Sequence, residues 1–114
     1  ERSRKIEQQR LNITDSIHYA SRIQKALMPS AEKMTKLFPS HFILNKPKDI
    51  VSGDYYWVSE KGNKLIIAVA DCTGHGVPGA FMSIMGINFL NEIVNNAEHP
   101  KSNEILNELR KHLI

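Results

Sequence analysis

The sequence contains very little cysteine and no long uninterrupted apolar run, and these shortages exclude several classes of protein. Cys72 is the single cysteine, so the chain cannot form an internal disulfide, and a reducing cytosol is the expected compartment. The longest apolar stretches, 65–70 and parts of 77–94, are expected to be too short or too polar to cross a bilayer. The charged N-terminus lacks the apolar segment of a secretory signal. We therefore expect a cytoplasmic protein with no direct membrane insertion, either free or, when intact, tethered to a membrane sensor.

An excess of charge of one sign is confined to the N-terminal segment. The 114 residues carry 15 Lys and Arg against 12 Asp and Glu, a net charge of +3. That whole excess falls in residues 1–28, and the rest of the chain is balanced. Because the basic residues of 1–28 alternate with acids and glutamines, the segment is a poor match for a nucleic-acid-binding arm. We expect no nucleic-acid partner.

Residues 1–28 contain no glycine or proline, and their pattern predicts one long helix that Pro29 ends. Apolar residues recur every seven positions, which gives the helix one apolar seam. The seam residues are Ile6, Ile13, Ala20 and Leu27. The seam fits a coiled coil that forms a homodimer, and it fits equally a helix packed on its own domain.

The rest of the chain predicts a small α+β domain. Residues 29–40 read as a linker with one or two helical turns. Three strands follow, at 41–46, 54–58 and 64–70, the last of them apolar enough to be buried on both faces. A turn at 59–63 joins the second and third strands, with Gly62 and Asn63 suited to positive φ. Two helices then follow, at about 77–95 and from Ser102, which is a plausible N-cap.

Two carboxylates are predicted to meet at one end of the hairpin. With a turn centred near Lys61, Asp54 lies close to Ala68, and Asp71 lies just beyond at the same end. Strand alternation puts Asp71 on the face of Val69. Adjacent carboxylates repel unless a proton or cation lies between them, and Mg²⁺ or Mn²⁺ suits such oxygen ligands. The alternative, that Asp71 is a helix cap and Asp54 a turn residue, remains open on spacing alone.

The glycines after Asp71 raise a different possibility. Residues 74–79, GHGVPG, match the G-x-G-x-x-G dinucleotide fingerprint between a strand and a helix. A Rossmann unit needs a second parallel strand 20–30 residues later, and helical sequence fills that interval. A carboxylate at Asp71 would also repel the pyrophosphate. We therefore do not expect a dinucleotide site.

Two motifs taken together carry a family resemblance. SGDYYW at 52–57 followed by VADCTGHGVPGAFMS at 69–83 resembles the metal-dependent protein phosphatases of the PPM (PP2C-like) class, and most closely the bacterial sporulation stage II E-type serine phosphatases. The segment ASRIQKALMPS at 20–30 is similar to the lead-in of that branch. The resemblance covers roughly residues 17–114 and implies a partial αββα sandwich, with antiparallel strands followed by two helices and preceded by a long N-terminal helix.

The resemblance also implies a metal centre. Asp54 and Asp71 would be carboxylate ligands of two Mn²⁺ or Mg²⁺ ions, Asp71 bridging them, and the backbone carbonyl of Cys72 would be a further ligand. The family hydrolyses phosphoserine or phosphothreonine with a metal-activated water. Eukaryotic members carry a histidine general acid where Thr73 stands here, so no catalytic residue is assigned, and His75 is expected to be a turn or second-sphere residue.

The resemblance divides the chain into a linker or coiled-coil helix, 1–28, and the N-terminal part of a phosphatase domain, 29–114. The sequence stops before the later aspartates of that family, so we expect it to be inactive in isolation. In the intact protein, we expect a phosphatase that acts on a regulatory phosphoprotein in bacterial signalling. The alternative is a dimerising module that couples an upstream sensor to an output domain.

Overall fold

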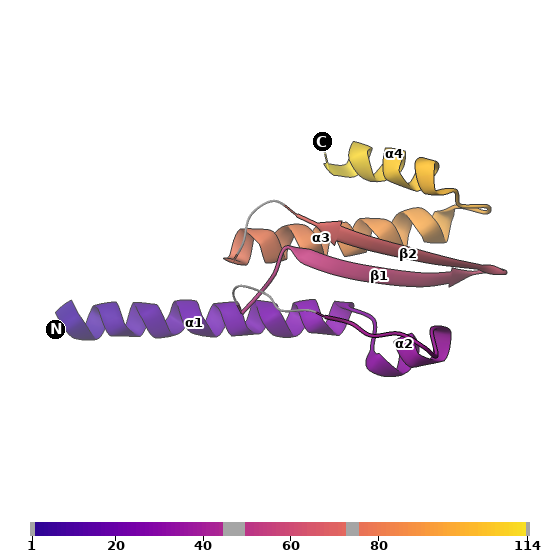
Figure 1. Cartoon of the computed structure of the whole chain (residues 1–114). Coiled ribbons are helices and arrows are strands. Elements are labelled where there is room, and N and C mark those ends of the chain that lie inside the picture. Colours follow the sequence, from indigo (N-terminus) through magenta and orange to yellow (C-terminus); the bar gives the residue numbers. More distant parts are fainter. Residues whose placement is uncertain (1, 45–49, 73–75, 114) are drawn as a thin grey trace.

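The computed structural model describes residues 2–44, 50–72 and 76–113. Four helices and one two-stranded antiparallel sheet make up this part of the chain (Figure 1). In chain order they are α1 (Arg2–Leu27), α2 (Ala31–Leu37), β1 (Asp54–Lys61), β2 (Lys64–Asp71), α3 (Gly76–Asn96) and α4 (Ser102–Leu113). Along the described residues, β2 is followed by the two helices α3 and α4.

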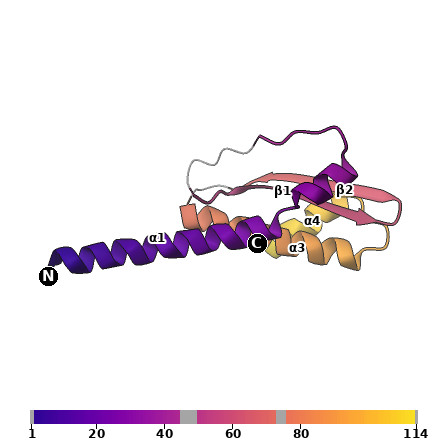
Figure 2. The same cartoon turned by 90° about the horizontal axis from the view of Figure 1, so that it is seen from below.

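Helix α1 has two halves with different surroundings. Its N-terminal half extends beyond the rest of the molecule (Figures 1 and 2), and every residue from Arg2 to Ile13 is exposed. Its C-terminal half packs against α3 and buries Ser21 and Gln24. The predicted seam is therefore divided, because Ile6 and Ile13 face solvent while Ala20 and Leu27 are half-buried.

The hairpin is longer than predicted, and its register differs from the sequence expectation. The turn consists of Gly62 and Asn63, and the register runs from Lys61 opposite Lys64 to Asp54 opposite Asp71. Gly62 has a φ of +61°, as the first central residue of a type II′ hairpin turn requires, whereas Asn63 does not have a positive φ. A turn centred near Lys61 was therefore wrong, and the correct centre brings the two aspartates directly opposite each other.

The hydrophobic core lies between one face of the hairpin and α3. Tyr55 and Trp57 of β1 pack with Ile87 and Leu90 of α3, and Ile105 of α4 joins the same cluster. The indole nitrogen of Trp57 donates a 2.8 Å hydrogen bond to the Asn91 side chain, so its polar group is also paired. This packing fixes which face of the hairpin is turned away from α3.

Two strand predictions need correction. Residues 41–44 form no strand, and Phe42 is 90% exposed, because a strand needs a neighbour to accept its backbone hydrogen bonds. Residues 45 and 46 lie outside the described residues. Strand β2 is half-buried on the α3 side only. Its outer face, with Leu65, Ile67 and Val69, is exposed in the part of the chain that the structure describes.

Two helix predictions also change. Ser102 is the first helical residue of α4 and not its N-cap, because the carbonyl of Lys101 accepts the first backbone hydrogen bond, from Ile105. Helix α3 is long and apolar enough, by length and composition, to cross a membrane, contrary to expectation. In the structure it is the core helix, with Ile87 and Val94 each 1% exposed.

Candidate metal-binding site

Asp54 begins β1 and Asp71 ends β2, and the two residues form a directly opposed pair at the open end of the hairpin. The next pair outward is joined by a hydrogen bond, 3.1 Å long, from the Cys72 N–H to the Gly53 carbonyl. Antiparallel pairs alternate between hydrogen-bonded and non-hydrogen-bonded types, so Asp54 and Asp71 form a non-hydrogen-bonded pair. Side chains approach each other most closely in pairs of this type. The backbone therefore forces the two carboxyl groups together.

Among the residues that the structure describes, no basic side chain forms an ion pair with Asp54 or Asp71. A hydrogen bond with Asp71, followed by the negative charge of that residue, raises the pKa of Asp54 above its ordinary value. Both side chains are exposed, so water screens part of the repulsion. A proton shared by the two carboxyl groups at low pH, or a cation bound between them at neutral pH, would relieve the remaining repulsion.

An open cavity of about 510 Å³ lies over the pair. Both aspartates line it together with Tyr56 and Val69 of the same outer face, and Ile43 and Leu44 of the preceding segment form part of its wall. Sequence reasoning missed the contribution of Ile43 and Leu44 because it placed them in a strand. The signal in the sequence that could have indicated this contribution was the position of Ile43 and Leu44 shortly before the SGDYYW motif at 52–57.

Cys72 follows β2 directly and is half-buried. Burial raises the pKa of its thiol, and the charges of Asp71 and Asp54 raise it further. The thiolate is therefore disfavoured, which argues against Cys72 as a nucleophile. Thr73 and His75 lie outside the described residues.

The donor set of this cavity suits a hard divalent cation. Mg²⁺ and Mn²⁺ prefer carboxylate, carbonyl and water oxygens, and two opposed carboxylates supply the first of these. Across residues 2–44, 50–72 and 76–113, no group of three or more His, Cys, Asp or Glu side chains is arranged to hold a metal ion. The pair would thus provide only part of a metal's coordination, and the ligand roles of Asp54, Asp71 and Cys72 remain predictions.

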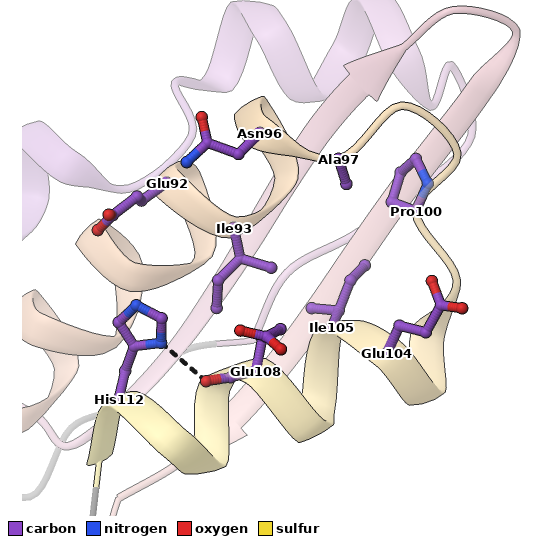
Figure 3. A pocket seen from close by; sticks show the side chains of 9 residues that line it. All are labelled: Glu92, Ile93, Asn96, Ala97, Pro100, Glu104, Ile105, Glu108 and His112. Atoms are coloured by element: carbon purple, nitrogen blue, oxygen red, sulfur yellow. Dashed lines mark hydrogen bonds between the residues drawn. The ribbon is translucent and has the colours of Figure 1, made fainter.

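A second cavity, of about 390 Å³, lies between α3 and α4 (Figure 3). Glu92, Glu104 and Glu108 line it, and His112 donates through Nδ1 to the Glu108 carbonyl at 2.8 Å. The Glu108 carboxylate is paired with Lys111 at 3.1 Å. Because Lys111 pairs with the Glu108 carboxylate, whereas Asp54 and Asp71 stand directly opposite each other, the aspartate pair is the better candidate site.

Comparisons with known proteins bear on the fold of this chain. No protein-family model matches the sequence, and no curated protein matches it significantly. Among solved structures, the chain is similar to the SiaA-PP2C domain of Pseudomonas aeruginosa, with 37% sequence identity and a TM-score of 0.79 over 90% of this chain. The chain spans 42% of the length of that structure. The likeness in sequence and structure to a PP2C domain confirms that this chain has a partial PP2C-like α+β fold.

Proposed function

We propose that this chain is part of a metal-dependent protein serine/threonine phosphatase of the sporulation stage II E-type branch. The observation that carries the proposal is the directly opposed pair of Asp54 and Asp71 in a chain similar to a PP2C domain. The branch assignment depends on the sequence motifs around these two residues and on the lead-in at 20–30.

The roles of this chain's residues follow from their positions. Asp54 and Asp71 would hold Mn²⁺ or Mg²⁺ with their carboxylates, and Cys72 would add its backbone carbonyl. The bound cations would neutralise phosphate charge and activate water for attack on phosphorus. Because both aspartates are exposed, a phosphoryl group on the surface of another protein can reach them. We propose a phosphoserine or phosphothreonine regulatory protein of a bacterial signalling pathway as the substrate, in the cytoplasm.

Metal binding by the 114-residue chain tests the site. Two carboxylates and one carbonyl leave a divalent cation mostly hydrated, so we expect weak Mn²⁺ binding by titration calorimetry. Asp54→Asn or Asp71→Asn should abolish it, whereas Glu60→Gln, an exposed acid on the same strand, should not. Strong Mn²⁺ binding that survives both aspartate substitutions would contradict the assignment.

Turnover tests the activity. We expect the 114-residue chain alone to release no phosphate from a phosphoserine peptide with Mn²⁺, because two carboxylates do not complete a two-metal centre. A longer polypeptide that continues this sequence to the length of the SiaA-PP2C domain should be active. Asp54→Ala or Asp71→Ala should abolish that activity. Robust, Asp71-dependent turnover by the short chain would refute its predicted inactivity.

A second function is favoured by the exposed half of α1. Ile6 is 64% exposed and Ile13 is 61% exposed, on a stretch of helix, 2–13, in which every residue is exposed. Isolated helices of about 12–15 residues are marginally stable in water, so this half would gain from a partner. We propose that residues 1–28 form a dimerising connector to an upstream sensor and that 29–114 belong to the phosphatase domain.

A further inference from the structure

Gln24, near the end of α1, is a buried polar residue that bonds to two other segments of the chain. It is 8% exposed. Its side-chain nitrogen donates to the Ser52 carbonyl and, at 2.7 Å, to the Ser83 hydroxyl on α3. Its side-chain oxygen accepts a 3.2 Å hydrogen bond from the Ser52 N–H. The amide group therefore pairs with both backbone groups of Ser52, much as a neighbouring strand would.

The hydrogen bonds continue from Ser52 to the aspartate pair. The Ser52 hydroxyl accepts a 3.0 Å hydrogen bond from the N–H of Asp54. Between them, the Gly53 carbonyl accepts from the N–H of Cys72, directly after Asp71. Gln24 is thus joined through Ser52 to the start of β1, and through Ser52 and Gly53 to the end of β2.

The nitrogen of the Gln24 amide that donates to Ser52 also fixes the side chain to α3. Ser83 is fully buried, and its hydroxyl donates to the Ala80 carbonyl at 2.7 Å while it accepts from Gln24. Because the Ser83 hydroxyl makes both hydrogen bonds, its position is fixed, and the Gln24 amide that donates to it has little freedom to move. The segment before Asp54 is therefore held against the core helix by a residue of α1.

We propose that Gln24 is a positioning residue for the Asp54–Asp71 site, which it orders when the C-terminal half of α1 is docked on α3. The primary amide of Gln24 supplies the two donors and the one acceptor that Ser52 and Ser83 together require. The inference takes one point from the proposed function, that Asp54 and Asp71 bind a metal ion. A glutamine with a merely structural role would stabilise the fold equally everywhere and leave the site unchanged once the protein is folded.

The test uses the 114-residue chain with Gln24→Met, which keeps the volume and removes the amide, and Gln9→Met on the exposed half of α1 as the control. Amide hydrogen exchange without metal and Mn²⁺ affinity by calorimetry are measured on each. In Gln24→Met we expect faster exchange at Ser52 and Cys72, unchanged exchange at Trp57, and about a 10-fold or greater loss of Mn²⁺ affinity. Gln9→Met should match the wild type.

Unchanged exchange at Cys72, a uniform increase along the hairpin, or unchanged Mn²⁺ affinity would each overturn the proposal. If the wild type binds no Mn²⁺, the metal assignment fails, and the exchange data alone decide whether Gln24 orders the strand ends. If Gln24→Met does not fold, Ser52→Ala decides, since it keeps both backbone bonds to Gln24 and removes the acceptor of the Asp54 N–H. That variant should lose Mn²⁺ affinity while Trp57 exchange is unchanged, and retention of full affinity would overturn the proposal.

Discussion

The phenol of Tyr55 on β1 occupies the space that a side chain at Gly86 on α3 would need. A Cβ atom built on Gly86 would collide with the Tyr55 hydroxyl and lie 3.0 Å from the ring carbon that bears it. Glycine in a helix interior normally costs about 0.5–1 kcal/mol relative to alanine, so this glycine is retained for space and not for helix propensity. It lets the strand that begins with Asp54 approach the core helix closely.

Gly86→Ala is therefore expected to lower stability, although alanine is the better helix former. Overpacking of this kind costs about 1–3 kcal/mol, which urea unfolding monitored by circular dichroism would measure. Asn88→Ala, at an exposed position of the same helix, should be neutral or slightly stabilising. An increase in stability for Gly86→Ala would mean that Tyr55 and α3 can separate without cost.

Lys61 and Lys64 are opposite each other at the turn, yet only Lys61 is expected to matter for stability. The Lys61 ammonium donates to the carbonyls of Val94 at 2.6 Å and Asn95 at 2.8 Å, at the C-terminal end of α3. A cation there satisfies free carbonyls and interacts favourably with the helix dipole. Lys61→Met should cost roughly 1 kcal/mol in thermal unfolding, whereas Lys64→Met should cost little. Equal effects of the two substitutions would contradict the capping role.

Stability of the metal-free chain should depend on pH through the aspartate pair. The pKa of Asp54 is raised in the folded state, so the folded chain holds this proton more tightly than the unfolded chain. That contribution is complete below the ordinary pKa, 3.8, and is lost as the pH rises through the raised value. Asp71→Asn removes the two largest causes of the raised pKa of Asp54, so the Tm advantage of this variant over wild type should be smallest near pH 3 and grow toward pH 7.

Glu60→Gln is the control for this measurement, because Glu60 is an exposed acid whose cross-strand partner is the apolar residue Leu65. Its Tm difference from wild type should not follow the same pH profile. Saturating Mn²⁺ should reverse the order of Asp71→Asn and wild type, since only the wild type retains both ligands. A Tm difference that does not vary with pH would show that the two carboxyl groups do not interact.

The α1 seam gives a prediction about association. Ile13→Glu should shift the chain from dimer to monomer in light scattering, because each apolar side chain buried in a dimer contributes roughly 1.5–3 kcal/mol. Gln8→Glu introduces the same charge on another face of α1 and should leave the dimer intact. A wild type that remains monomeric at high concentration would refute the predicted dimer.

The element types and the carboxylate pair could be predicted from the sequence because their signals are local. Pro29 marks the end of α1, a continuous apolar run marks β2, and the motifs around Asp54 and Asp71 mark the site. The exact register could not be predicted, since placing the turn at Gly62 and not at Lys61 moves the partner of Asp54 by three residues. The position of the turn depends on which register of β1 against β2 buries Tyr55 and Trp57 against α3.

Other features depended on tertiary contacts that leave no local pattern. Residues 41–44 have the composition of a strand, but a strand exists only where another backbone pairs with it. Ile6 and Ile13 fit the seam as well as Leu27 does, yet only the C-terminal half of α1 lies against α3. Gln24 looks like a surface residue of a polar helix, and only its position opposite Ser83 and Ser52 buries it.

The two-residue turn at Gly62 and Asn63 restricts how this hairpin can change in evolution. It lies at the opposite end of eight register pairs from the aspartates. Yet a single inserted or deleted residue there must be absorbed as a bulge or as a slip of one strand past the other. A slip of one position would turn the two carboxylates to opposite faces of the sheet. We therefore expect homologues to exchange residues at the turn while insertions and deletions of odd length are selected against.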